Sequence, residues 1–184
     1  MKVAVIIDAP NVRGMTKAMG KNINFKAFLK HIRGPNRQLE LLEVFYDVVP
    51  FNGTNNDFIR SLEDFGFEGI PVPLKPYAPH EKNKATFKSR TDQRITIEVL
   101  DHLQHNRFDC LVFVSGDSDY EFLLQKCRDA KKRVEVWATS STLSNELKKV
   151  ADAYYNFDDP AFKHLLLKVD NNLPWWKKQR AVEG

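Results

Sequence analysis

Two short motifs place acidic residues directly after apolar runs, and these residues are the first candidates for chemistry. The run CLVFV precedes SGDSDY, which carries Asp117 and Asp119, and VAVII precedes Asp8 and then Asn11 in DAPN. An apolar strand gains nothing in packing from an acidic pair at its end. Two apolar segments that both end in aspartate therefore predict one shared site.

Such a site is expected at the edge of a parallel sheet, where ligands bind outside the carboxyl ends of the strands. If the two strands are neighbours, Asp8, Asp117 and Asp119 converge there, and Asp92 opens a predicted helix at the same edge. Two like charges about 4 Å apart repel by roughly 4 kcal/mol at an effective dielectric constant of about 20. Bound protons or a cation must offset this repulsion. Carboxylate oxygens suit Mg²⁺ or Mn²⁺, and such sites typically catalyse phosphoryl transfer.

Each aspartate also has a structural interpretation. Asp8 can be a solvated strand end, and Asp119 can interact with the positive start of a helix whose N-cap is Ser118. For a single aspartate the structural role is the commoner one. The recurrence of the pattern on two strands favours a site, beside which Gly116 is expected to let the backbone turn sharply.

The elements that must position these residues alternate between strands and helices. Short runs rich in Val, Ile and Phe predict strands covered on both faces, at residues 2–7, 40–47, 68–73, 109–114 and 133–137. Helices are predicted from Asn24, from the Thr54/Asn55 turn, from Thr91, from Ser118, within residues 143–150 and after Pro160. This alternation predicts an α/β fold with a mainly parallel sheet.

The composition is that of a soluble globular protein. The 184 residues are 42% hydrophobic and 28% charged, with a net charge of +4. No apolar run approaches the ~20 residues of a membrane span, and the first apolar run meets an aspartate too early for a signal peptide. Cys110 and Cys127 are expected to be reduced core thiols, so we predict a cytoplasmic protein without a membrane partner.

A basic segment precedes Asp92. Residues 74–90 contain two prolines and many charges, which predicts a long loop. Its basic side chains are expected to contact RNA phosphates at the rim of the acidic site, together with one from the following helix: Lys82, Lys84, Lys88, Arg90 and Arg94. Tyr77 and Phe87 are candidates for stacking on unpaired bases.

Other residues with chemical potential have simpler interpretations. His102 and His105 have helical spacing but no evident third ligand, so we expect them at a solvated helix end. Trp175 and Trp176 fit packing against the domain or a homodimer contact at least as well as base stacking.

Several motifs together resemble a known family. VAVIIDAPN, the aspartate in KSRTDQRI, and FVSGDSDYEFLL followed by RVEVWA resemble the NYN domains of the PIN-like nuclease superfamily, and among them the bacterial LabA/DUF88-type group. SNELKKVADAYYNFD resembles the final helix and strand of that family. The resemblance implies a PIN-like Rossmannoid three-layer sandwich over residues 1–158, with residues 159–184 forming a C-terminal helix and a basic, tryptophan-containing extension.

The resemblance also implies Mg²⁺ or Mn²⁺ as cofactor and cleavage of RNA. By position, Asp8, Asp92 and Asp117 resemble the metal-binding acids, Asn11 the amide of the first motif, and Asp119 the second acid of the last motif. Members often carry a further acid where this chain has Glu98. Six residues of helix turn through about 600°, so Glu98 should point about 120° away from Asp92 unless Asp92 precedes the helix.

We therefore predict a divalent-metal-dependent ribonuclease, an endoribonuclease, acting on single-stranded or structured RNA. The main alternative is an RNA-binding or regulatory module of the same fold with little or no catalysis. A small-molecule phosphatase is disfavoured because DAPN lacks the second acid of a D-x-D nucleophile motif. No glycine-rich dinucleotide or Walker motif follows the first strand. Whether the chain forms a homodimer is left open.

Overall fold

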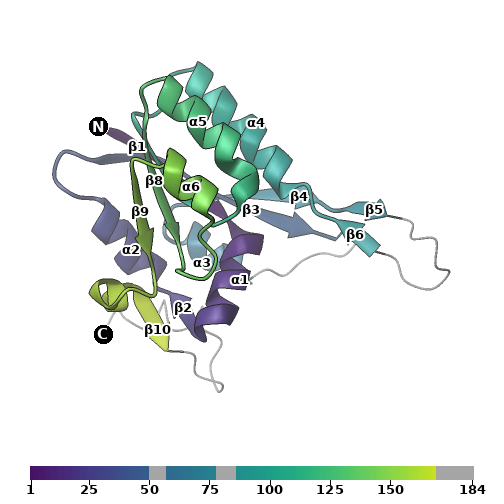
Figure 1. Ribbon diagram of the computed structural model, residues 1–184. Helices are drawn as coiled ribbons and strands as arrows, with labels where there is room; N and C mark the ends of the chain where they lie inside the picture. The colour runs from purple at the N-terminus through teal and green to yellow at the C-terminus, as the bar shows by residue number, and fades with distance from the viewer. Residues whose placement is uncertain (50–56, 78–85, 169–184) are drawn as a thin grey trace.

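The five apolar runs predicted as strands all belong to one central sheet (Figure 1). The computed structural model describes residues 1–49, 57–77 and 86–168. Within these residues the sheet has the strand order β4-β3-β1-β7-β8-β9, and every neighbouring pair is parallel. The strands are β1 (Lys2–Asp8), β3 (Gln38–Val48), β4 (Glu68–Pro73), β7 (Cys110–Val114), β8 (Arg133–Ala138) and β9 (Ala153–Asn156). The predicted parallel α/β sheet is confirmed.

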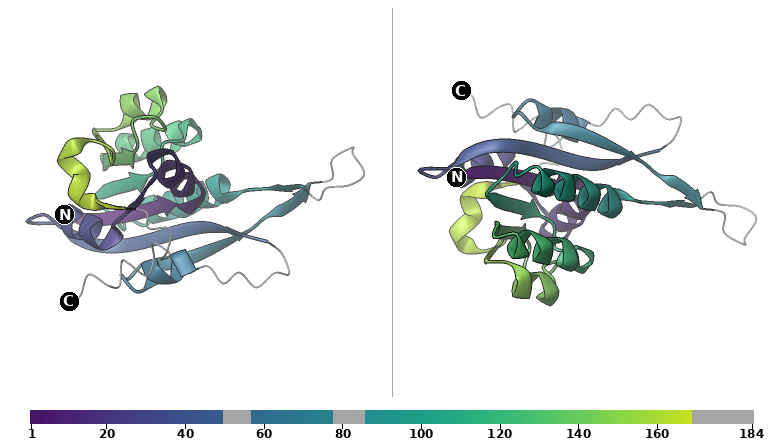
Figure 2. Two further views of the ribbon diagram at one scale, coloured as in Figure 1. Left: turned by 90° about the horizontal axis from the view of Figure 1, so that it is seen from below. Right: turned by 90° about the horizontal axis from the view of Figure 1, so that it is seen from above.

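Helices cover both faces of this sheet and complete a three-layer sandwich (Figure 2). On one face lie α2 and α3, and on the other lie α4, α5 and α6. The helices are α1 (Ala9–Met19), α2 (Phe25–Ile32), α3 (Asp57–Glu63), α4 (Thr91–Gln104), α5 (Glu121–Asp129) and α6 (Asn145–Val150), with 3₁₀ turns η1 (Ser118–Tyr120) and η2 (Pro160–Leu165). The layer order agrees with the predicted PIN-like Rossmannoid arrangement.

Polar caps set the starts of two predicted helices. The Asn24 side chain accepts a hydrogen bond from the Ala27 N–H at 3.0 Å, and Ser144 accepts one from the Leu147 N–H at 3.2 Å. Each cap satisfies an N–H group that has no partner within its helix. The start of α3 lies among residues 50–56, outside the described part of the chain.

Aromatic side chains fasten α2 and α3 to their face of the sheet. The ring of Phe28 lies 5.1 Å from that of Trp137 on β8, and Phe25 lies 6.1 Å from Phe58 on α3. Burial of such a side chain contributes roughly 1.5–3 kcal/mol. Cys110 and Cys127 are free and buried in the core, and burial raises the pKa of each thiol to about 12, so both stay protonated.

Helix α1 was not among the predicted helices. Its buried residues are only Ala9, Val12 and Met15, too weak a stripe for the periodicity to stand out. The signals that mark it are local. Asp8 caps its start, Pro10 occupies the first turn, and Gly20 ends it with a left-handed φ of 60°.

The segment predicted as a long loop is in part a β-ribbon. β5 (Lys75–Tyr77) and β6 (Thr86–Lys88) pair antiparallel and project from the carboxyl edge of the sheet (Figures 1 and 2). The loop prediction is therefore wrong for these six residues. Residues 78–85, which include Lys82 and Lys84, lie outside the described part.

The chain after β9 also differs from expectation. The helix predicted after Pro160 is the short 3₁₀ turn η2, followed by β10 (Leu166–Lys168), which pairs antiparallel with β2 (Lys21–Ile23). Residues 169–184, with both tryptophans of the expected extension, lie outside the described residues. In the described ranges, no helix has the length and apolarity needed to cross a membrane.

Candidate active site

All five residues predicted for the catalytic site line one hollow of about 530 Å³ at the carboxyl edge of the sheet. Asp8 ends β1, the SGDSDY motif follows the neighbouring strand β7, and Asp92 lies in the first turn of α4. We call this feature the acidic hollow. It is lined by Asp8, Pro10, Asn11, Gly14, Lys88, Ser89, Thr91, Asp92, Asp117, Asp119, Tyr120 and Thr142.

Asp8 is buried and held by three neutral donors. Its Oδ1 accepts the Asn11 N–H at 3.1 Å, and its Oδ2 accepts the hydroxyls of Ser115 at 3.2 Å and Tyr120 at 3.0 Å. An ionised carboxylate offers about four acceptor positions, so about one remains. Asp8 is thus both the cap of α1 and a fixed carboxylate of the hollow.

The electrostatic environment of Asp8 disfavours its charge. Burial raises the pKa of the Asp8 carboxyl, the three hydrogen bonds lower it by less, and the negative charge of Asp117 raises it further. Burial also raises the pKa of the Tyr120 hydroxyl, as do the charges of Asp8, Asp92 and Asp117. Tyr120 therefore stays protonated and donates to Asp8. The acids are close enough to repel one another electrostatically. Within the described residues, no Lys or Arg side chain forms a hydrogen bond with Asp8.

The loop that carries Asp117 is clamped from two sides. The Asn11 side-chain oxygen accepts the Gly116 N–H at 3.0 Å, and the Gly116 carbonyl accepts the Ser144 N–H at 3.1 Å. A Cβ added to Gly116 would lie 2.2 Å from the carbonyl oxygen of Thr142. Glycine is therefore required here by close packing rather than by the expected sharp turn. Asn11 positions this loop, whereas its backbone N–H contacts Asp8.

The two acids of the SGDSDY motif are more exposed than Asp8. Asp117 is half-buried and its Oδ1 accepts the Asp119 N–H at 3.1 Å, which caps η1. The Asp117 N–H in turn donates to Ser115 at 3.3 Å, so the hydroxyl that bonds Asp8 also anchors this turn. Asp119 is exposed at the mouth of the hollow.

The start of α4, which carries Asp92, is anchored by Asp47, an aspartate that was not among the predicted site residues. No side chain at the N-cap position of α4 caps the helix. Instead Asp47, at the end of β3, accepts hydrogen bonds from Thr91 at 2.7 Å and Ser89 at 2.8 Å. The predicted strand 40–47 also ends in aspartate, so the signal used for Asp8 would have found Asp47 as well. Ser115 and Tyr120 lie within the motif but were not assigned a role.

The predicted RNA-contacting residues are only partly brought to the hollow. Lys88 lines it. Arg90 donates to the Pro73 carbonyl at 3.2 Å, and Arg94 pairs with Glu98 at 2.7 Å; both arginines line a separate, smaller hollow beside β4. Lys82 and Lys84 lie outside the described residues.

Two further sequence expectations concern α4. Asp92 lies within the helix, and Glu98 is absent from the lining of the acidic hollow, as its angular offset predicted. The expectation of a solvated His102 is wrong, because His102 is buried and its Nε2 lies 2.7 Å from Glu43 on β3. Its partner is 59 residues away in the chain and has no sequence signature. His105 is exposed, as expected.

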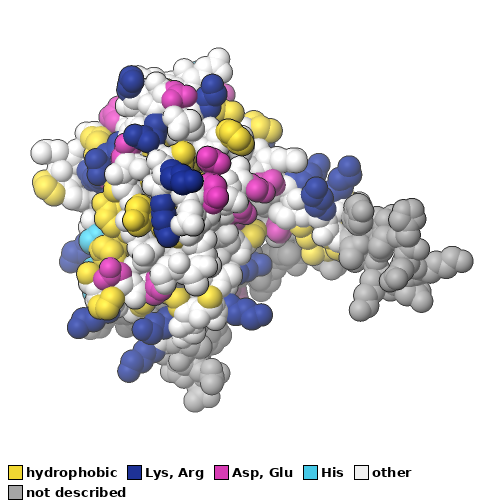
Figure 3. All heavy atoms as spheres, in the orientation of Figure 1, with side chains coloured by type: hydrophobic (Ala, Val, Ile, Leu, Met, Phe, Trp, Pro, Cys, Tyr) yellow, Lys and Arg dark blue, Asp and Glu magenta, His cyan; other side chains and the backbone are white. Residues whose placement is uncertain are grey.

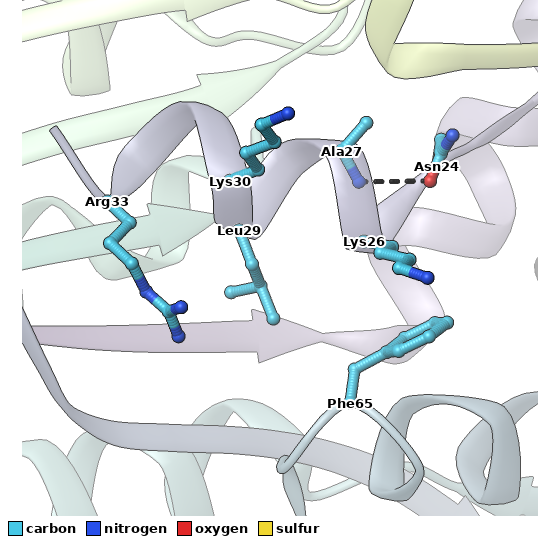
Figure 4. Close-up of a pocket in the computed structure, with 7 residues that line it drawn as sticks. All are labelled: Asn24, Lys26, Ala27, Leu29, Lys30, Arg33 and Phe65. Carbon is cyan, nitrogen blue, oxygen red and sulfur yellow. Dashed lines mark hydrogen bonds between the residues drawn. The ribbon is translucent and has the colours of Figure 1, made fainter. Parts of the chain in front are cut away.

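A second hollow of about 570 Å³ lies on α2 and has a different character (Figure 4). The basic residues Lys26, Lys30 and Arg33 line it together with the apolar side chains of Leu29 and Phe65. Among its described lining residues there is no carboxylate. Its chemistry cannot hold a hard cation, so the slightly smaller acidic hollow is the better candidate for catalysis.

The acidic hollow fits a hard divalent cation by donor chemistry. Its carboxylates supply oxygen ligands, and the raised pKa of Asp8 reflects a charge that a cation would stabilise. Within the described residues, no three His, Cys, Asp or Glu side chains are arranged as ligands of one metal ion. Binding of a metal ion therefore requires one of two things. Either the side chains of the more exposed acids rearrange, or water molecules lie between the acids and the ion.

The fold and the motifs identify the family. The NYN domain model matches residues 2–159, and the chain belongs to the NYN domain family, within the PIN-like nuclease superfamily. A protein of unknown function from Vibrio parahaemolyticus RIMD 2210633 has a similar structure, with a TM-score of 0.69 and 23% sequence identity. That match covers 90% of this chain and 96% of the other. At this identity it supports the fold alone, and no curated protein matches the chain.

Proposed function

We propose that the protein is a divalent-metal-dependent ribonuclease that cleaves RNA internally. The observation that carries the proposal is the convergence of Asp8, Asp92, Asp117 and Asp119 on one hollow, from three separate parts of an NYN fold. These four acids would hold Mg²⁺ or Mn²⁺. When bound, the ion would polarise the scissile phosphate and lower the pKa of a coordinated water. The LabA/DUF88-type grouping, the cytoplasmic location and the domain boundary at residue 158 stay predictions.

The chain's own residues would supply orientation and charge. Tyr120 and Ser115 hold the Asp8 carboxylate in one orientation through their hydroxyls. Asn11 fixes the loop that presents Asp117. Lys88 would attract a phosphate to the hollow, and the exposed Asp119 would orient the attacking water or bind a second ion.

Cleavage of a labelled single-stranded RNA tests this proposal. Products that require Mn²⁺ or Mg²⁺ are expected from the wild type and from Asp129→Asn, whose carboxylate is exposed on α5. Asp117→Asn should give none. A circular RNA is expected to be opened, because an exonuclease needs an end. Equal products from the wild type and Asp117→Asn would contradict the site.

A binding module without turnover is the second candidate function. It is favoured by the engagement of Asp8 in three hydrogen bonds and by the lack, in the described part, of three acids placed around one ion. It predicts that the protein shifts RNA in a gel-mobility experiment and gives no cleavage products at any concentration of divalent cation. Asp117→Asn would then bind RNA with the same affinity as the wild type.

A further inference from the structure

The ribbon formed by β5 and β6 places two lysines directly opposite each other. We call residues 75–77 and 86–88 the arm. In its register Lys75 pairs with Lys88 and Pro76 with Phe87. Directly opposed residues of an antiparallel pair point to the same face, with Cβ atoms about 5 Å apart, and like charges there are destabilising. Both lysines are exposed, and neither forms a salt bridge within the described residues.

The face of the arm that carries these lysines is continuous with the acidic hollow. Lys88 lines the hollow together with Asp92 and Asp117. Lys75 shares the face of Lys88 because the two residues are directly opposed in the ribbon. Phe87 lies on the reverse face, because side chains alternate along a strand. Basic and acidic side chains lie close together where the arm meets the body of the protein (Figure 3).

We propose that Lys75 and Lys88 form a phosphate clamp that holds the nucleic-acid backbone beside the cleavage site. Two unpaired cations that repel each other are stabilised when a polyanion lies between them. The clamp rests on the proposed ribonuclease function, because a neighbouring site for phosphodiester chemistry favours a phosphate backbone over an acidic protein. It assigns Lys75, which was not among the residues predicted to contact RNA, to substrate binding. It also implies a preference for strands that extend beyond the scissile bond.

Kinetics on long and short substrates test the clamp. For a labelled RNA of about 20 nucleotides, Lys75→Glu is expected to raise KM about tenfold, an effect in KM rather than in kcat. The same substitution should change cleavage of a dinucleotide less than about twofold, because a dinucleotide bound in the hollow meets Lys88, which lines it, but does not extend to Lys75, which does not line it. Lys126→Glu on α5 is the matched exposed control and should leave both substrates unaffected. An unchanged KM for Lys75→Glu on the long RNA would overturn the clamp.

Binding without metal separates the clamp from the proposed function. Fluorescence anisotropy in EDTA should show weaker RNA binding by Lys75→Gln and Lys75→Glu. The slope of log K against log salt is negative, and its magnitude should fall by about 0.7 for each phosphate that the variant no longer neutralises. If the wild type cleaves no RNA but Lys75→Glu still weakens binding, the ribonuclease proposal fails and the clamp stands. If cleavage holds and binding is unchanged, the clamp fails alone.

A DNA strand of the same sequence identifies the contacted chemistry. Equal weakening of RNA and DNA binding by Lys75→Glu supports a phosphate contact, because both backbones share that group. Weakening for RNA alone would overturn the phosphate assignment in favour of the ribose hydroxyl. No weakening for either strand would overturn the nucleic-acid clamp and point to an acidic protein as the occupant of the arm.

Discussion

Two clusters of charged side chains lie near opposite ends of the same sheet. In one cluster the protein neutralises its own buried carboxylate, and in the other it does not. Near the amino end, the buried Glu135 accepts two hydrogen bonds from Arg37, at 2.5 and 3.0 Å, and one from Arg133 at 2.6 Å. Burial alone would raise the pKa of Glu135, but the two arginines outweigh it and lower that pKa. At the carboxyl end, Asp8 is bonded only to neutral donors among the described residues, and its pKa is raised.

The difference distinguishes a structural charge from a functional one. Glu135 is neutralised by the protein itself, so its cluster needs nothing from outside. The acidic hollow collects several carboxylates with Lys88 as the one described cation in its lining, which leaves a negative potential for a ligand to neutralise. Substitutions in the first cluster should therefore act on stability, and those in the second on activity.

The largest expected effect is that of Asp8→Asn on cleavage. The variant should lose at least about 1000-fold in rate, or about 4 kcal/mol of transition-state stabilisation, because a carboxylate proposed to hold the ion becomes neutral. Its free energy of unfolding should not fall, since the buried charge of Asp8 is unfavourable in the folded state. Urea unfolding and RNA cleavage measure the two quantities. A large loss of stability with unchanged cleavage per folded molecule would show that Asp8, like Glu135, has a structural rather than a functional role.

Gly116→Ala is expected to impair both stability and activity, because Gly116 lies in the clamped loop beside Asp117. The added Cβ would lie 2.2 Å from a backbone oxygen that cannot rotate away, so we expect about 3 kcal/mol of destabilisation. Gly14→Ala is the control: an added Cβ there meets nothing within 4 Å, and alanine should stabilise the helix by roughly 0.5–1 kcal/mol. Unfolding free energies of the two variants that agree within about 0.5 kcal/mol would contradict the close packing at Gly116.

Glu135→Gln should lower stability by about 2 kcal/mol at pH 7 and leave cleavage per folded molecule unchanged, because it weakens three charged hydrogen bonds. The pKa of Glu135 is lowered below 4.5 in the folded state. Its stabilisation is therefore present above about pH 4.5 and is lost as the pH falls through the folded pKa.

Denaturation at a series of pH values measures this dependence. The difference between wild type and Glu135→Gln should shrink below about pH 4, whereas the exposed Glu68→Gln should show no difference at any pH. A difference that is constant between pH 7 and pH 3 would exclude ionisation of Glu135 as its source.

The smallest expected effect concerns Asp47, which anchors the start of α4 rather than lining the hollow. Asp47→Ala removes acceptors for Thr91 and Ser89 and should lower kcat about tenfold, or about 1.4 kcal/mol, through misplacement of Asp92. Asp47→Asn keeps an acceptor oxygen and should recover kcat to within about threefold of wild type. Equal losses in both variants would indicate that the charge, rather than the position, of Asp47 matters.

Local patterns were sufficient to predict most of the sheet and the location of the acidic hollow. Apolar runs and caps such as Asn24 and Ser144 are properties of neighbouring residues, and strand ends that carry Asp8 and Asp117 meet because parallel strands share an edge. Helix α1 was missed because its apolar stripe is short, although its cap and Pro10 are visible in the sequence.

Contacts between distant residues could not be predicted in the same way. His102 was expected in solvent because its partner Glu43 lies on another element, and Asp47 reaches Thr91 across 44 residues. The arm was predicted as loop because its strands have three residues each and gain their pairing only from each other. The packing around Gly116 likewise depends on Thr142 and Asn11, which come from separate parts of the chain.

Binding of Mn²⁺ followed by electron paramagnetic resonance tests most directly whether the acidic hollow is a metal site. The signal of free Mn²⁺ should fall on addition of the wild type and of Asp129→Asn, with at least one ion bound per chain. Asp8→Asn and Asp117→Asn should each weaken this binding at least about tenfold. Equal Mn²⁺ binding by all four proteins, or cleavage of RNA by a wild type that binds none, would contradict a carboxylate-held ion at this edge of the sheet.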